Sequence, residues 1–376
     1  MKITAIDVID LRAPRPTSET YDGAYVGCIL RVKTDADLEG IAEIDSAPDV
    51  MKAIIHARPS LTWPPLFSLF EGQDPLGDIE ALWDRVYEKT LHNGRRGILI
   101  HALSGIDIAL WDLRGKAAGK STAAVLGTPQ RDRVRAYTTL VRIGSTADSV
   151  KRVIDAGLKH NTKAIKLCSD AAWRHDRKLV ELLCRTARDY VGRDITIMLD
   201  AYGVWKSADE VEPHWGLFRD IGLEWLEAPL PMDDLQGYAR LSGRGIPVTG
   251  GDMGLTTRFE FKDMAERGGV EILQPDPTYV GGLTEFRRVA AIAKTMNRRI
   301  IPHGYKSNVL LATNLAFLSQ HWTEEWLEYS IADSPLRWEM THEKLPIGSD
   351  GRVAVPQGPG LGVTLDEAAI AKYRVD

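Results

Sequence analysis

The sequence predicts an α/β protein in which an N-terminal α+β domain precedes a (β/α)8 barrel of the modified TIM type. Short apolar runs alternate with helical segments from Val134 onward, and the strand-helix pair recurs eight times. Polar residues close consecutive runs at near-constant spacing, since Asp200, Glu227 and Asp252 are separated by 27 and 25 residues. One strand and one helix of a barrel take roughly that length, and a whole barrel takes about 250 residues. A chain of 376 residues therefore leaves roughly 120 for a second domain.

The first domain, residues 1–125, is expected to combine antiparallel strands with helices. The segments ITAIDVIDL and YVGCILRVKT alternate with period two and are joined by a polar connection at about residues 14–24. From about residue 79 to 120 the periodicity becomes helical, and IHALSGIDIALWDLRGKAAG keeps apolar positions at three- and four-residue steps up to Gly119. This mixture does not fit a barrel, so it predicts a separate capping domain.

The barrel is expected to span residues 126–335, and a tail is expected to span residues 336–376. The barrel begins with VRAYTTLV and continues through AIKLC, ITIMLD and LEWLEA to EWLEYS, with a helix after each strand. The tail contains GRVAVPQGPGLGVTLDEAAIAKYRVD, which predicts a return strand, a Gly/Pro loop and a short terminal helix. We expect the tail to pack on the capping domain or to seal the barrel.

Composition narrows the class of protein. Apolar residues make up 44% of the chain, charged residues 26%, and the net charge is −5, so no partner such as nucleic acid or a membrane surface is indicated. Cys28, Cys168 and Cys184 are odd in number and lack metal-type spacing, which favours a reducing compartment. With no signal-peptide core and no apolar run of transmembrane length, we expect a cytoplasmic protein.

The residues that close the apolar runs predict one shared site. A lone acidic residue at a strand end is usually a helix cap or a salt-bridge partner, but here Asp200, Glu227 and Asp252 follow one another at three successive strands. The carboxyl ends of barrel strands meet at one rim, where three anions repel strongly and favour a hard divalent cation. The series continues at the next three strand ends with Asp276, His303 and Glu328.

These motifs resemble the enolase superfamily, in its mandelate racemase-like subgroup, over essentially the whole chain. The resemblance rests on LHNGRRGILIHALSGIDIALWDLRGK, on Lys166 in AIKLC, on the ordered strand-end residues, and on Pro302-His303-Gly304. Two positions depart from the subgroup pattern. Cys168 replaces the second lysine of a Lys-x-Lys pair, and Asp252 replaces a glutamate as the third metal ligand. Asp252 still supplies a carboxylate, so the change at Cys168 is the larger one.

The resemblance implies Mg²⁺ held by Asp200, Glu227 and Asp252, and removal of a proton α to a carboxylate. It implies that His303 is the base, because Asp276 would orient one imidazole nitrogen and raise the basicity of the other. Glu328, if protonated by proximity to other anions, would donate a hydrogen bond to the developing enediolate.

The residues of the second barrel strand, Lys166 and Cys168, each have two possible roles. Lys166 would face His303 across the barrel, either as a base with a depressed pKa or as a charged group that binds the substrate carboxylate. Cys168 would be a pocket-shaping side chain or, as a thiolate, a second base.

Specificity is expected to come from loops that cover the barrel mouth. The candidates for substrate contact share a polar side chain near a predicted loop or strand end, and each is equally readable as a solvated loop residue. They are Tyr21, Arg95 and Arg96 in the first domain and Tyr202, Trp205, Tyr305 and Lys306 in the barrel.

Taken together, these observations predict dehydration of an aldonate or aldarate to a 2-keto-3-deoxy acid. Racemisation or epimerisation requires bases on both faces, and Cys168 weakens one of them, whereas dehydration can use His303 twice. Cycloisomerisation of a sugar-acid lactone is the alternative, because LSGIDIALWDLRGK and EILQPD also resemble the galactarolactone cycloisomerase branch. A sugar-acid binding protein without activity is the non-enzymatic alternative. The partner is thus a small sugar acid, and relatives suggest a homo-oligomer, a dimer or an octamer.

Overall fold

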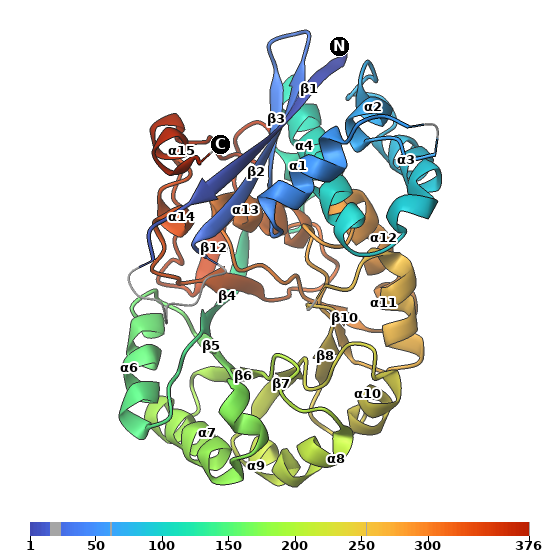
Figure 1. Ribbon diagram of the computed structural model, residues 1–376. Helices are drawn as coiled ribbons and strands as arrows, with labels where there is room; N and C mark the ends of the chain where they lie inside the picture. The colour runs from blue at the N-terminus through green and yellow to red at the C-terminus, as the bar shows by residue number, and fades with distance from the viewer. Residues whose placement is uncertain (16–23, 61, 253, 376) are drawn as a thin grey trace.

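The computed structural model describes residues 1–376 except 16–23, 61, 253 and 376. The N-terminal domain lies above the barrel in Figure 1, and both chain ends lie near it. Its sheet has the order β1-β2-β3, with β1 (Ile3–Arg12), β2 (Val26–Thr34) and β3 (Glu39–Ile44) antiparallel. The third strand was not predicted separately. Five of its six residues are buried, so the segment EGIAEI has no period-two alternation to reveal it.

Helices complete the N-terminal domain and confirm the helical periodicity after residue 79. They are α1 (Pro48–His56), α2 (Leu66–Phe70), α3 (Ile79–Gly94), α4 (Ile98–Ala117) and α5 (Thr122–Leu126). Helix α4 packs so closely on β3 that a Cβ at Gly40 would collide with the carbonyl oxygen of Ala109. Asp112 of α4 accepts hydrogen bonds from the amides of Ile41 and Leu361, at 2.9 and 2.7 Å, and thereby joins the first sheet to the C-terminal tail.

Eight parallel strands form the barrel wall. In sheet order they are β10 (Arg299–Ile300), β9 (Ile272–Leu273), β8 (Val248–Gly250), β7 (Leu223–Glu227), β6 (Thr196–Asp200), β5 (Ala164–Cys168), β4 (Arg133–Leu140) and β11 (Leu327–Ser330). Among the described residues no ladder joins β10 to β11. The register places Cys168 opposite Asp200 and Asp200 opposite Glu227, so neighbouring strand ends are level. The predicted barrel class is confirmed.

Helices surround the strands, as Figure 1 shows. They are α6 (Ala147–Leu158), η1 (Ala171–Arg174), α7 (Arg177–Val191), α8 (Ala208–Val211), η2 (Glu212–His214), α9 (Trp215–Asp220), α10 (Leu235–Leu241), α11 (Thr257–Glu266), α12 (Gly282–Thr295), α13 (Asn308–Leu318) and α14 (Pro335–Trp338). The eighth repeat differs from the prediction, because its helix α14 has only four residues. The chain leaves the barrel there to form the tail.

A separate apolar cluster fills the barrel interior. Its members are buried side chains in or directly beside seven of the eight strands, all except β8: Tyr137, Ala164, Met198, Trp225, Ile272, Ile301 and Trp326. The Tyr137 and Trp225 rings meet edge to face with centroids 5.5 Å apart. This layer forms the floor beneath the polar C-terminal rim.

The N-terminal rim of the barrel is closed by paired charges. Arg299, the first residue of β10, donates to both carboxylate oxygens of Glu325 at 2.8–3.3 Å and to Glu224 at 3.3 Å. Arg135 of β4 lies 3.9 Å from the same Glu325 and stacks over Trp326, 4.2 Å from its ring centroid. Each of these four charged side chains therefore has an opposite charge in contact.

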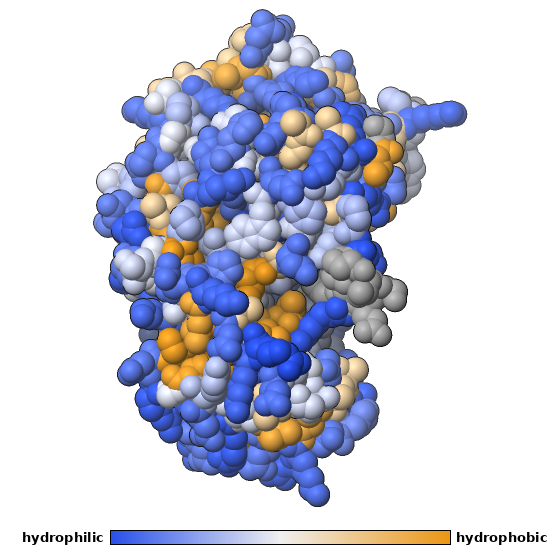
Figure 2. Space-filling view, turned by 90° about the vertical axis from the view of Figure 1, so that its left-hand side faces the viewer, coloured by the Kyte–Doolittle hydropathy of each residue, from blue (hydrophilic) through white to orange (hydrophobic). Residues whose placement is uncertain are grey.

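The tail contains the expected strand and helix. Strand β12 (Arg352–Ala354) pairs antiparallel with β4, and α15 (Glu367–Tyr373) lies beside β1, where Leu11 and Arg374 form a bridge. The tail thus contacts both the barrel and the first sheet. No helix among the described residues is long and apolar enough to cross a membrane. The face shown in Figure 2 is mainly hydrophilic, with apolar residues gathered in patches near the waist between the two halves.

Candidate active site

Three carboxylates from consecutive strands converge at the C-terminal rim. Asp200 is the last residue of β6, Glu227 is the last residue of β7, and Asp252 lies two residues after β8. All three are buried, and one ligand oxygen from each lies within 4.8 Å of the others. The equal spacing in the sequence thus corresponds to one cluster in space, because the three strands are adjacent and parallel.

The chemistry of this cluster fits a divalent cation. Oδ1 of Asp252 is buried and accepts no hydrogen bond within the described part of the chain. Burial raises the pKa of Asp252 well above its usual value, and the charges of Glu227 and Asp200 raise it further. An unpaired carboxylate oxygen beside two other carboxylates is an unfavourable arrangement that a hard cation such as Mg²⁺ relieves. Asp200, Glu227 and Asp252 could hold that ion, and the shorter Asp252 still reaches the group.

Lys166 of β5 lies among these acids. Its Nζ is 2.5 Å from Oε1 of Glu227, 2.9 Å from Oε1 of Glu328 and 3.5 Å from Oδ2 of Asp200. Burial acts to lower the pKa of Lys166, but the carboxylates of Glu227 and Glu328 outweigh it and hold the pKa well above its usual value. The raised pKa favours a charged ammonium, which suits the carboxylate-binding role of Lys166 better than that of a neutral base.

His303 and Asp276 form a hydrogen-bonded pair. Nδ1 of His303 lies 2.8 Å from Oδ2 of Asp276, while Oδ1 of Asp276 accepts from both the amide and the hydroxyl of Thr278 at 2.6 Å. Asp276 accepts at both oxygens, so Nδ1 carries a proton and Nε2 is the ring nitrogen left for a substrate. Burial opposes protonation of His303, but Glu328 and Asp276 raise its pKa to about 10.

Glu328 connects the two cationic residues. Its Oε1 contacts Lys166 and accepts from the Thr139 hydroxyl at 2.5 Å, and its Oε2 accepts from the Gly304 amide at 2.9 Å and lies 3.9 Å from His303 Nε2. Glu328 was predicted to close a strand, but β11 begins at Leu327, so Glu328 lies inside it.

The charges around Glu328 do not favour its expected protonation. Burial acts to raise its pKa, but Lys166 and His303 lower the pKa to about 2. The carboxylate is ionised and orients both cations.

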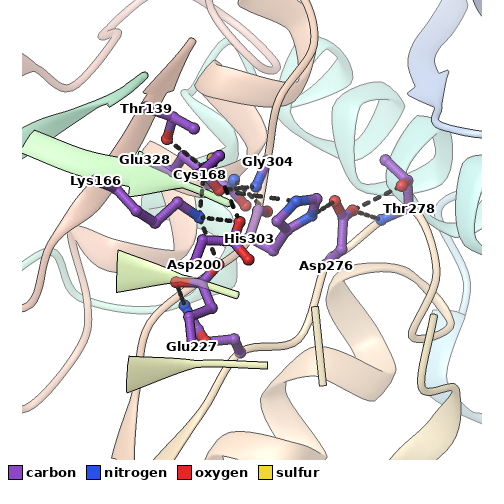
Figure 3. A network of polar contacts seen from close by, with 12 residues as sticks. Thr139, Lys166, Cys168, Asp200, Glu227, Asp276, Thr278, His303, Gly304 and Glu328 are labelled. Atoms are coloured by element: carbon purple, nitrogen blue, oxygen red, sulfur yellow. Dashed lines mark hydrogen bonds and ion pairs between the residues drawn. The ribbon is translucent and has the colours of Figure 1, made fainter. Parts of the chain in front are cut away.

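Cys168 lies at the end of β5, with its Sγ 3.7 Å from Oδ2 of Asp200. Burial and the Asp200 charge raise the pKa of this thiol well above its usual value. The raised pKa favours a thiol that shapes the cavity over a thiolate base. Figure 3 shows Lys166 and His303 reaching the carboxylates from opposite sides, with Cys168 near Glu328.

Four of these residues, Cys168, Asp200, His303 and Glu328, line a cavity of about 390 Å³. Its wall consists of Thr139, Val141, Arg142, Gly144, Cys168, Ser169, Asp170, Asp200, Tyr202, His303, Tyr305 and Glu328. Two of the residues proposed for substrate contact, Tyr202 and Tyr305, are among them. Sequence reasoning missed Thr139 and Arg142. Thr139 lies near the end of the first barrel strand, so the strand-end rule could have found it, whereas Arg142 lies in an irregular loop without such a signal.

Other proposed substrate contacts lie elsewhere. Lys306 pairs with Asp45 at 2.9 Å and donates to the carbonyl of Val26, which joins the barrel to the first domain. Trp205 is fully buried in the apolar core, and Tyr21 lies outside the described residues.

The two adjacent arginines are also absent from the cavity wall. Arg96 donates to the Tyr87 hydroxyl at 3.1 Å, lies 3.4 Å from Glu260, and stacks over Phe259 at 5.1 Å. Arg95 is exposed at the end of α3. Neither Arg95 nor Arg96 is among the residues of the cavity wall.

Comparison with known proteins agrees with this geometry. Residues 3–127 match the family model described as mandelate racemase / muconate lactonizing enzyme, N-terminal domain, and residues 145–369 match the model described as enolase C-terminal domain-like. The D-galactarolactone cycloisomerase of Agrobacterium fabrum is 32% identical over 323 residues, which cover 81% of this chain and 82% of that protein. The arabinonate dehydratase of Saccharolobus solfataricus is 32% identical over 299 residues, or 79% and 78% of the two chains.

Solved structures show the same architecture. A member of the enolase superfamily from Polaromonas sp. JS666 superposes with a TM-score of 0.88 at 28% identity, covering 100% of this chain and 98% of that one.

Proposed function

Because this chain belongs to the mandelate racemase / muconate lactonizing enzyme family of the enolase superfamily, we propose that it is a Mg²⁺-dependent sugar-acid dehydratase. The substrate is an aldonate or aldarate, and the product is a 2-keto-3-deoxy acid. One observation carries the proposal: the His303-Asp276 pair and a cluster of three buried carboxylates meet at one cavity, whose wall includes His303 and Asp200. A base and a cation site in one cavity are the two parts that removal of a proton α to a carboxylate requires.

Asp200, Glu227 and Asp252 would hold the ion. When bound, it supplies positive charge beside the substrate carboxylate and makes the adjacent C–H bond more acidic. The pKa of His303 is about 10 without the ion, and the positive charge of a bound ion would lower it. Nε2 of the neutral imidazole then takes the α-proton, with Asp276 holding the opposite nitrogen protonated. The same imidazolium then gives its proton to the β-hydroxyl, which leaves as water while the electron pair of the former C–H bond forms the α,β double bond. The resulting enol tautomerises to the 2-keto-3-deoxy acid.

The side chains of Lys166 and Cys168 on β5 favour elimination over racemisation. Racemisation needs a group that delivers a proton to the face opposite His303. Lys166 is engaged by Glu227 and Glu328, and the Cys168 thiol has a pKa well above its usual value, so neither exchanges a proton readily near neutral pH. Charged Lys166 is instead suited to hold a substrate carboxylate oxygen.

Cycloisomerisation is the second candidate. It is favoured by the 32% identity to the D-galactarolactone cycloisomerase of Agrobacterium fabrum, equal to that of the arabinonate dehydratase. It would use the same proton abstraction, followed by departure of a ring oxygen from the β-carbon instead of a hydroxyl.

The test is proton NMR in deuterated water with Mg²⁺ and a panel of aldonic acids, aldaric acids and their lactones. The wild type is compared with His303→Asn and with His342→Asn, a control at an exposed histidine near Asp366. We expect a 2-keto-3-deoxy product with the wild type and His342→Asn and none with His303→Asn.

Other outcomes contradict the proposal in distinct ways. A 2-keto-3-deoxy acid formed from a lactone, and none formed from the open-chain acid, would establish cycloisomerisation. Deuterium at the α-carbon with inverted configuration would establish epimerisation and require a base on the Lys166 side. Binding without exchange in any acid would favour a sugar-acid binding protein.

A further inference from the structure

Arg142 is a charged residue of the cavity wall that the proposed mechanism leaves unused. It follows β4 in the loop that leads to α6 and lines the same cavity as His303 and Glu328. The Arg142 side chain is exposed, and no ion pair or hydrogen bond of its guanidinium is found within the described part of the chain. An exposed arginine on a loop is ordinary, so its conformation and its surroundings decide whether it has a role.

The backbone holds Arg142 in an unfavourable conformation. Its φ is +56°, in the left-handed region that residues with a Cβ rarely adopt. The loop is fixed two residues later by Gly144, with φ +75°, where a Cβ would collide with Ser149. Thr146 and Ser149 then form a reciprocal cap of α6, each donating its backbone amide to the other's hydroxyl at 3.1 Å. The loop is therefore a defined structure that places Arg142 at the cavity, and such strain often marks a functional position.

The charged residues at the cavity differ in whether a partner within the protein contacts them. Lys166 is surrounded by Glu227 and Glu328, and His303 lies between Asp276 and Glu328. Asp170, an acid of the outer wall, accepts from the amide of Ala172 and caps η1. Among the described residues, Arg142 remains as the cation of this wall without a carboxylate in contact.

Nearby Arg174 provides a contrast. It lies on the next loop of the rim, in η1, and makes three hydrogen bonds to Glu210 at 2.8–3.3 Å. Its charge is therefore compensated within the protein, while that of Arg142 is available to a ligand. A guanidinium recognises a planar carboxylate with two parallel hydrogen bonds.

We propose that Arg142 determines specificity by binding a second oxyanion of the substrate, at the end remote from the reacting carboxylate, so that the substrate is a dicarboxylate of the aldarate class. This inference rests on the proposed function for the position of the reacting carboxylate. It narrows the substrate from aldonates and aldarates to those sugar acids that are charged at both ends.

Binding tests the inference separately from turnover. Galactarate and galactonate differ only at C6, which is a carboxylate in one and a hydroxymethyl group in the other. Their dissociation constants are measured by calorimetry with the Mg²⁺-loaded His303→Asn protein, which cannot turn them over, with and without Arg142→Gln. Arg174→Gln is the matched control because it removes an arginine charge from the same rim. A terminally phosphorylated aldonate distinguishes a phosphate from a carboxylate as the second oxyanion.

We expect tighter binding of galactarate than of galactonate, and a loss of about 10²-fold for galactarate alone in Arg142→Gln. Arg174→Gln is expected to leave both constants within about threefold. A preference for the phosphorylated acid that Arg142→Gln removes would keep Arg142 as the oxyanion-binding residue and assign a phosphate. Equal binding of all the acids, or an equal loss for all of them in Arg142→Gln, would overturn the inference. Selective binding without turnover by the wild type would instead refute the proposed reaction and leave the role of Arg142 standing.

Discussion

The two rims of the barrel use charged residues in opposite ways. At the N-terminal rim Arg299 contacts Glu325 and Glu224, and Arg135 contacts Glu325 as well, so that cations and anions balance. At the C-terminal rim Asp200, Glu227, Asp252, Asp276 and Glu328 surround two cationic side chains, Lys166 and His303. One of those acids, Asp252, has a buried oxygen with no donor among the described residues.

This difference between the rims suggests that the N-terminal rim contributes to stability and the C-terminal rim to chemistry. Charges that are paired between strands hold the strands in place, whereas buried charges in excess raise the free energy of the folded protein and persist where a ligand compensates them. We therefore expect substitutions at the N-terminal rim to lower stability and substitutions at the C-terminal rim to lower activity. At least one substitution at the C-terminal rim should raise the stability of the metal-free protein.

The largest effect is expected for Asp276→Asn. Both donors of Thr278 would fix the amide oxygen, so the amide nitrogen would face His303 and the proton of the imidazole would move to Nε2. The base would then be blocked, and kcat should fall by about 10²–10⁴-fold with little change in the free energy of unfolding. Steady-state kinetics and urea unfolding check this, and a kcat within about threefold of the wild type would show that the pair does not act as described.

Glu325→Gln should instead lower stability and leave activity nearly unchanged. The side chain of Glu325 is 4% exposed, and its loss leaves Arg299 and Arg135 without a buried counter-charge. Because Arg299 is 32% exposed and water compensates part of the loss, the free energy of unfolding should fall by about 1–3 kcal/mol. Activity of the folded protein should stay within about twofold. Glu324→Gln, at an exposed pair with Arg352, is the control and should cost less than about 1 kcal/mol. An equal loss in both variants would contradict the proposed importance of the buried pair.

Asp252→Asn should stabilise the metal-free protein. Its folded pKa is raised by burial and by Glu227 and Asp200, so the destabilisation is absent at low pH and grows as the pH rises above the ordinary value of 3.8. At pH 8 with a chelator, the substitution should raise the free energy of unfolding by about 1 kcal/mol or more. With Mg²⁺ at a hundredfold excess over its Kd the wild type alone should gain about 2.7 kcal/mol, which reverses the order of the two proteins. Urea unfolding with and without Mg²⁺ checks both signs, and destabilisation under chelation would refute the idea of an excess of negative charge.

The smallest effect is expected for Glu328→Gln, which should change the pKa of His303. The pKa of His303, about 10, is raised by Glu328 and Asp276 against the effect of burial. A histidine with a raised pKa stabilises the fold fully below its unfolded value, and this stabilisation disappears as the pH rises through about 10. Glu328→Gln should therefore lower the pKa of His303 toward 6.5, as followed by NMR of the imidazole protons in the metal-free protein. An unchanged titration would mean that Glu328 does not set the charge of His303.

Much of the C-terminal rim could be predicted from the sequence, because parallel strands of equal spacing bring their ends together whatever fills the loops. That rule led to Asp200, Glu227 and Asp252, and to the Asp276-His303 pair. It did not give protonation states.

Protonation depends on distances between side chains of non-adjacent strands. Glu328 is ionised because Lys166 and His303, from two other strands, both lie near it, and no local pattern contains that information.

The substrate contacts of loop residues were also difficult to predict. Arg96 and Lys306 are polar residues near loops, as predicted, but each finds a partner inside the protein, in Glu260 and Asp45. Arg142 received no attention because its loop has no periodicity, and its position depends on a left-handed backbone angle that the segment VRIGST does not reveal.

Calorimetric titration of Mg²⁺ into the wild type, Asp252→Asn and Glu325→Gln tests the contrast between the rims most directly. We predict one Mg²⁺ per chain for the wild type and for Glu325→Gln, and none for Asp252→Asn. Binding retained in Asp252→Asn, or absent from the wild type, would contradict the assignment of the C-terminal rim as the cation site.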